Sequence, residues 1–166
     1  MRRLSPAARK LTLTLHIASS VGWLGAVAGF LALAIAGATA NDVEVARAAY
    51  IAMEATGRAV LVPLALASLA TGIIQALGSR WGLLSHYWVV TKLAATVIAT
   101  GVLLLYLQTL EALAEMARSS STTALQSPSP ALHALGAVML LAIALVLSVY
   151  KPRGVTAYGW RRQQSS

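Results

Sequence analysis

Apolar residues occur along this chain in four runs, and each run is long enough to cross a lipid bilayer. The runs are Leu11–Ala38, Ala59–Gly78, Tyr87–Leu110 and Ala131–Tyr150. Roughly 20 helical residues span the hydrocarbon core of a membrane. The remaining residues form short loops and two basic tails, which leaves no room for a separate soluble domain. The pattern therefore predicts an all-α protein, an integral membrane four-helix bundle. The expected helices cover residues 11–38, 58–78, 87–117 and 130–150.

The segment before the second run has a pattern of its own. An apolar stripe recurs there at helical spacing, formed by Val43, Ala46, Ala49, Tyr50 and Met53. We expect residues 42–56 to form an amphipathic helix, either on the membrane surface or as an extension of the second span. Asn41 and Glu44 have the spacing of a capping box at its start. Pro63 removes one backbone donor, so it should kink the second span within its first turns.

The net charge of +8 is arranged in alternation with the spans. The acidic residues lie in the first and third loops. Basic residues dominate the tails and the second junction, at Arg2, Arg3, Arg9, Lys10, Arg80, Lys92, Lys151, Arg153, Arg161 and Arg162. This positive-inside pattern predicts a multi-pass membrane protein with both termini cytoplasmic. It also favours contact with anionic lipids over nucleic-acid binding.

Several kinds of chemistry are excluded by composition and motif. The chain has no cysteine, which excludes disulfides, thiolate metal sites, iron–sulfur clusters and covalent c-type haem attachment. Any metal or haem would be held by nitrogen or oxygen ligands or by methionine sulfur. No GxSxG, HExxH, phosphate-loop or dinucleotide motif supports hydrolase or nucleotide chemistry. Ala38-Thr39-Ala40 resembles a signal cleavage site, but the run before it is too long for a signal peptide, so we expect a retained helix.

Two titratable residues interrupt the apolar runs at matching depth. His16 and Lys92 each lie five residues inside a run. At 1.5 Å per residue both are about 8 Å from the same membrane boundary. An ionisable side chain in hydrocarbon is costly unless it is paired, ligated or facing a cavity. The two side chains can therefore meet in an inner polar site.

Three further residues are candidates for this inner site. Ser19 and Trp23 follow His16 on one helical stripe, and His86 lies about one and a half turns before Lys92. His16 is a candidate axial ligand of haem iron, or a histidine that hydrogen-bonds to a neighbouring helix. Lys92 would pair with a haem propionate or an anionic substrate, ligate iron when deprotonated by burial, or snorkel to the headgroups. Trp23 is by itself typical of a core, and His86 of the membrane interface.

A second polar cluster is expected near the opposite boundary, at Glu54, Arg58 and His133. Glu54 and Arg58 are four residues apart and can pair. His133 lies more than roughly 20 Å from His16 by helical rise, so these two histidines cannot ligate one iron. We interpret the outer cluster as a salt bridge and cap.

Several segments resemble a superfamily of small bacterial membrane bundles. They are Leu15-His16-Ile17, Gly22-Trp23-Leu24-Gly25 and Trp88-Val89-Val90-Thr91-Lys92-Leu93. The superfamily includes HemJ-type protoporphyrinogen oxidases and the membrane domain of the copper-resistance protein D. Over nearly its whole length the chain is similar to an uncharacterised family of small bacterial predicted integral membrane proteins. That similarity includes Thr71-Gly72, Leu77-Gly78, Trp81-Gly82-Leu83, His86-Tyr87-Trp88 and Tyr150-Lys151-Pro152-Arg153-Gly154.

The resemblance implies a four-helix bundle whose first-helix histidine and third-helix lysine form a polar site. In HemJ-like proteins that site is associated with haem b. The correspondence covers His16, Trp23 and Lys92 only. In HemJ proteins the sequence around this site is longer and more basic than in this chain. The resemblance therefore supports haem binding more than porphyrinogen-oxidising activity.

Together these features favour a haem b-binding membrane protein with a redox or electron-transfer role. If the protein is an enzyme, we expect a membrane oxidoreductase. His16 is the predicted metal ligand. A transport subunit for a small solute or metal is an alternative suggested by the copper-resistance resemblance. Copper(I) itself prefers sulfur ligands, and the methionines do not cluster with His16. A structural assembly subunit is another alternative, in which Gly25 and Gly29 would form a close helix interface. The small-residue faces also favour a homodimer.

Overall fold

Four long apolar helices form a bundle, and each is long and apolar enough to cross a membrane. The computed structural model describes residues 5–79, 82–119 and 127–164. The first span is α1 (Pro6–Thr39), and the second consists of α2 (Val43–Thr56), η1 (Gly57–Leu61) and α3 (Val62–Leu77). The third and fourth are α4 (Tyr87–Arg118) and α5 (Ser129–Tyr150). Arg2, Arg3, Arg80, Trp81, the Arg162 side chain and most of the Ser/Thr-rich loop lie outside the described residues.

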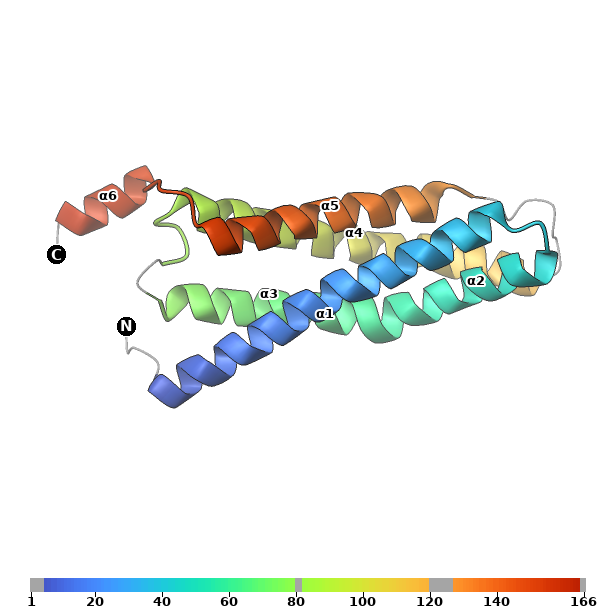
Figure 1. Cartoon of the computed structure of the whole chain (residues 1–166), viewed down its shortest axis with the longest axis horizontal. Coiled ribbons are helices and arrows are strands. Elements are labelled where there is room, and N and C mark those ends of the chain that lie inside the picture. The colour runs from blue at the N-terminus through green and yellow to red at the C-terminus, as the bar shows by residue number, and fades with distance from the viewer. Residues whose placement is uncertain (1–4, 80–81, 120–126, 165–166) are drawn as a thin grey trace.

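The spans follow one another up and down the bundle, so both chain ends lie at the same end of the molecule (Figure 1). Helix α1 packs against α2, α3 and α5, and α4 packs against the same three helices. Helices α1 and α4 therefore occupy diagonal positions, and long side chains from the two can meet inside the bundle. The predicted all-α bundle of four apolar helices is confirmed.

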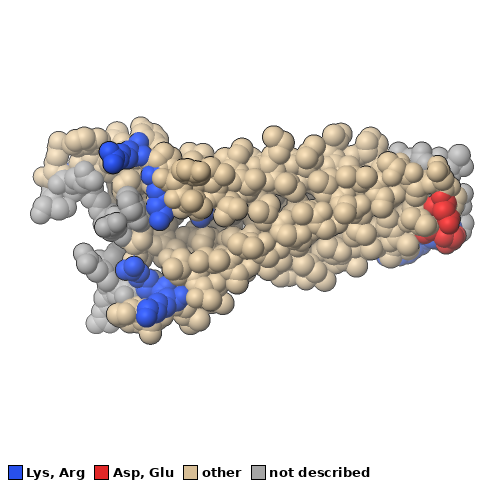
Figure 2. Space-filling model, in the orientation of Figure 1, with Lys and Arg blue, Asp and Glu red and all other residues tan. Residues whose placement is uncertain are grey.

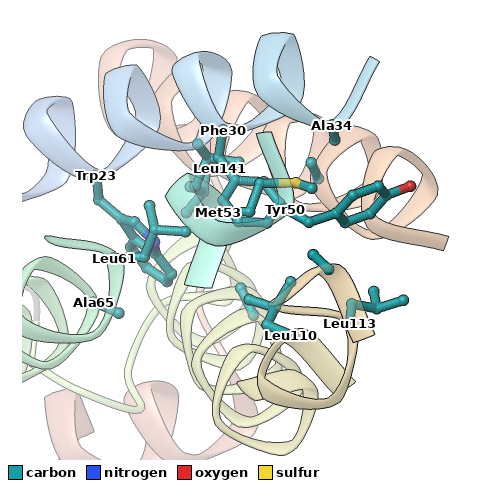
Figure 3. Close-up of a cluster of buried hydrophobic side chains, with 14 residues drawn as sticks. Trp23, Phe30, Ala34, Tyr50, Met53, Leu61, Ala65, Leu110, Leu113 and Leu141 are labelled. Atoms are coloured by element: carbon teal, nitrogen blue, oxygen red, sulfur yellow. The ribbon is translucent and has the colours of Figure 1, made fainter. Parts of the chain in front are cut away.

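The packed core fills the middle of the bundle and the half that contains α2. Figure 3 shows Phe30 of α1 beside Met53 of α2 and Trp23 of α1 beside Leu61 of η1, with Leu110 of α4 below them. Trp23 is 1% exposed and Met53 is 0% exposed. The outer faces are also apolar, and large exposed side chains include Leu105, Leu132, Met139 and Val149. Such an apolar surface on a helical bundle is the face that a bilayer covers.

The amphipathic segment before the second span is an extension of that span. Its predicted capping box at Asn41 is wrong, because the Asp42 carboxylate accepts from the Glu44 amide at 2.8 Å and caps the helix one residue later. The second span contains a π-helical segment, η1, just before Pro63, and the kink predicted at Pro63 itself stays a prediction. The Val62 amide donates to the Gly57 carbonyl, five residues back. Such π-bulges are single-turn features of α-helices and are frequent at functional sites.

Charge divides the molecule into two ends (Figure 2). All five acidic residues lie at the end formed by α2 and the last turns of α4. There the Glu54 carboxylate binds Arg118 at 2.6 Å and Arg58 at 3.6 Å, which confirms the predicted Glu54–Arg58 pair. Arg58 also binds Glu111 at 2.8 Å, so the network joins the second span to α4. The opposite end, where the chain begins and finishes, has a basic surface.

The C-terminal tail forms a further helix, α6 (Ala157–Gln164), which extends beyond the end of the bundle (Figure 1) and was not predicted from the sequence. The Thr156 amide donates to the Ser85 carbonyl at 3.0 Å, and the Thr156 hydroxyl donates to the Leu84 carbonyl at 2.6 Å. Gly159 lies so close to this loop that a Cβ there would overlap the Ser85 oxygen and lie 2.7 Å from Val155 Cγ1. The tail is therefore held by backbone contacts to the loop that precedes α4.

Candidate functional site

The imidazole of His16 is held in one orientation by α3. Its Nδ1 lies 3.1 Å from the Thr71 hydroxyl oxygen. That hydroxyl donates its only proton to the Ala67 carbonyl at 2.6 Å, so it can only accept from the histidine. With the hydroxyl proton assigned to this shortest contact, Nδ1 carries the ring proton, and Nε2 is the nitrogen left for another partner.

That other partner is Lys92, whose Nζ lies 3.4 Å from His16 Nε2. The predicted meeting of His16 and Lys92 is thus confirmed. One proton lies between these two nitrogens, because a doubly protonated pair would place two donors and two positive charges face to face. When the pair is protonated, it carries a single positive charge that either nitrogen can hold.

The close approach of α1 and α3 depends on Gly72. A Cβ at this position would lie 3.1 Å from His16 Cε1 and 3.6 Å from Nδ1. A larger residue would therefore move the ring away from its Thr71 hydrogen bond. One turn along α1, the Ser20 and Ser68 hydroxyls pair at 2.8 Å and tie the same two helices together.

A large cavity of about 1550 Å³ opens around the His16–Lys92 pair in the basic half of the bundle. Its walls are mostly aliphatic and come from α1, α3, α4 and α5. Representative apolar lining residues are Leu13, Ile17, Leu24, Leu93, Leu141 and Leu145. The polar lining includes Gln75, and the basic residues Arg9 and Lys151 also line it. The core side chains, with Trp23 at the boundary, fill the bundle beyond it.

The other predicted site residues occupy different positions. Trp23 lines the cavity. Ser19 is buried, and its hydroxyl donates to the His16 carbonyl at 3.2 Å, so it supports the backbone of α1. His86 immediately precedes α4 and pairs through its backbone with Val155 of the tail. His86 is not among the residues that line the cavity.

Four residues of α3 were missed as site residues, namely Ser68, Thr71, Gly72 and Gln75. A signal was present in the chain. Ser68, Thr71 and Gln75 are three and four residues apart in an otherwise apolar helix, which places them on one face. That stripe faces His16 and the cavity.

His133 belongs to neither the inner site nor the ion-pair network. Its ring stacks on Tyr106 with centroids 4.0 Å apart, and its Nδ1 lies 2.9 Å from the Ser129 carbonyl. A smaller, almost wholly apolar cavity of about 330 Å³ lies beside this pair, and Trp23 separates it from the large cavity. Within the described residues, no group of three His, Asp or Glu side chains is placed to hold a metal ion.

Comparison with known proteins adds no identification. No family model matches the chain, and no match was found among curated proteins or among solved structures. The resemblance to HemJ-like and uncharacterised membrane proteins therefore stays a prediction.

Proposed function

We propose that this protein binds haem b in the membrane and has a redox or electron-transfer role, with His16 Nε2 as the axial iron ligand. The observation that carries the proposal is the Nδ1–H bond from His16 to Thr71. Metal-ligating histidines donate their second ring N–H to a fixed acceptor, which sets the tautomer and orients the ring. His16 has this arrangement, and its Nε2 lies on the side of Lys92.

The surrounding residues fit a haem group. A cavity of about 1550 Å³ exceeds the volume of roughly 300–1,000 Å³ that is usual for small-molecule sites. Its leucine and isoleucine walls suit the macrocycle, while Lys92 would bind a propionate or become the second nitrogen ligand. Haem supplies one-electron chemistry when bound, and its potential depends on the axial ligand and the polarity of the shell.

We propose further that both chain ends face the cytoplasm of a bacterial plasma membrane. The support is the concentration of basic side chains at the end where both termini lie, since lysine and arginine are enriched on the cytoplasmic side. The His16–Lys92 pair would then lie about 8 Å inside the inner membrane boundary, counted along the helices at 1.5 Å per residue.

The test is the visible spectrum of the protein purified in mild detergent, oxidised and then reduced with dithionite. We expect a Soret band and b-type bands in the reduced protein. His16→Ala should lose them, whereas the matched control His133→Ala, a histidine at the other end of the bundle, should keep them. A full haem complement in His16→Ala, or a protein that stays colourless after haem is added, would overturn the proposal.

The homodimer expected from the sequence is also a proposal. Gly25 and Gly29 face away from the bundle, and a Cβ at either position would meet nothing within 4 Å in the described part of the chain. Helices with small residues four apart can pack closely in lipid. Cross-linking in membranes tests this, and Gly29→Leu should reduce a dimer band if this face forms the contact.

A further inference from the structure

No acidic side chain of the described residues lies near the His16–Lys92 pair to neutralise its charge when it is protonated. The five acidic residues are Asp42, Glu44, Glu54, Glu111 and Glu115, and all lie at the opposite end. On α4 itself, Glu111 follows Lys92 by 19 residues, which is about 28 Å of helix. A charge removed from water is costly unless it is paired, so an anion from outside the chain is expected at Lys92.

A second polar group in the same cavity also lacks a partner. The Gln75 side-chain nitrogen is buried and has no hydrogen-bond acceptor in the described structure. Gln75 lies one turn of α3 beyond Thr71, toward the basic end. A buried donor without an acceptor costs roughly 1–3 kcal/mol, so a ligand oxygen that reaches this amide would remove that cost.

The apolar lining of the cavity indicates that the anionic group belongs to a molecule with an apolar body. Leu24, Leu93 and Leu141 line it, and no carboxylate is among its lining residues. Lys92 lies one to two turns inside α4 from the basic end. A ligand with a charged head at this depth would carry an apolar body toward the bilayer centre, which is the orientation of an acyl chain in the inner leaflet.

We propose that the cavity binds the oxyanion head of an apolar molecule, with Lys92 neutralising the head and the Gln75 amide donating to it. The site needs no iron, but it uses the same cavity and the same lysine as the proposed haem, so a bound haem would exclude this ligand from Lys92. Two sources have this chemistry: a free long-chain carboxylate and the phosphate of an anionic lipid.

The experiment uses the full chain in phosphatidylcholine nanodiscs, with oleate and oleyl alcohol as probes. The two differ only in the head group, so their difference isolates the anion site. We expect oleate to bind at least about tenfold more tightly, the scale of one hydrogen bond to a charged group. Lys92→Met and Gln75→Leu should each reduce this preference. Lys10→Met, the same substitution at a basic-end lysine that does not line the cavity, should leave it unchanged.

A second arm separates the two sources. In nanodiscs that contain phosphatidylglycerol, an unchanged oleate preference assigns the site to a free carboxylate. The site is assigned to a lipid phosphate if phosphatidylglycerol suppresses oleate binding. In that case native mass spectrometry should show phosphatidylglycerol retained by the wild type but not by Lys92→Met. Equal binding of oleate and oleyl alcohol, with no lipid retained, overturns the proposal. If Lys92→Met fails to fold, Lys92→Arg should keep the preference, and a loss in that folded variant would also count against the site.

Discussion

The contact between the C-terminal tail and the loop before α4 can be tested by adding a single methyl group at Gly159. Replacing glycine by alanine inside a helix normally stabilises it by about 1 kcal/mol. At this position the added Cβ would overlap the Ser85 carbonyl oxygen. Because that atom belongs to the backbone, no side-chain rotation can relieve the overlap. Gly159→Ala should therefore release the tail, against the usual sign of the substitution.

The size of the effect follows from the bonds that hold the tail. Thr156 makes two of them, to Ser85 at 3.0 Å and to Leu84 at 2.6 Å, and Tyr87 donates to the Gly154 carbonyl at 3.4 Å. At about 1 kcal/mol net for each bond, the three contribute about 3 kcal/mol. Losing them changes the ratio of docked to undocked tail by about 150-fold.

Hydrogen–deuterium exchange with mass spectrometry on the protein in nanodiscs gives the readout. Peptides covering residues 84–88 and 154–160 should exchange faster in Gly159→Ala, by up to about 150-fold, while the spans stay protected. Gly29→Ala is the matched control, because a Cβ there meets nothing within 4 Å. Unchanged or slower exchange of the tail in Gly159→Ala would refute the reasoning, since it would mean that helix propensity outweighs the backbone contact.

Three further substitutions test interactions elsewhere in the bundle. Thr71→Val removes the acceptor of the His16 Nδ1–H and should weaken haem binding by about 10–100-fold in a spectral titration, while Thr71→Ser should restore it. Tyr50→Phe leaves the Ser127 amide without its hydrogen-bond acceptor at 3.0 Å. The free energy of unfolding should fall by about 1–3 kcal/mol, which would lower the Tm. An unchanged Tm would contradict this expectation. Glu54→Gln weakens the ion pairs with Arg118 and Arg58, and because such pairs are worth at most about 1 kcal/mol, the fall in Tm should be small and should vanish at high salt.

The spans could be predicted because length and hydropathy alone decide whether a helix can cross a bilayer. The meeting of His16 and Lys92 could be predicted for a related reason. The rise of a helix fixes the depth of every residue once the membrane boundary is known, and both residues lie at one depth. Depth was not sufficient for His133, which shares a boundary with Glu54 and Arg58 but stacks on Tyr106 instead.

The partners of His16 on α3 were harder to predict, because they depend on how each helix is rotated about its own axis. Rotation is set by the packing of all the helices together, and hydropathy constrains it weakly when the outer faces are as apolar as the core. Thr71 and Gly72 therefore became site residues only when α1 and α3 were seen in contact. The tail helix α6 was missed because mainly backbone hydrogen bonds hold it, and these leave little trace in residue type apart from Thr156 and Gly159.

The π-helical segment of the second span has a consequence for how the length of this chain can change in evolution. A π turn holds one more residue than an α-helix needs, so η1 resembles a single-residue insertion that the helix has absorbed. Each residue turns an α-helix by about 100°. A deletion in an α-helical turn between Met53 and Ala65 would rotate the buried face that contains Met53 relative to the face that contains Ala65, whereas a deletion within Gly57–Leu61 would leave both faces in place. Natural variants that differ in length within this span should therefore gain or lose their residue at η1.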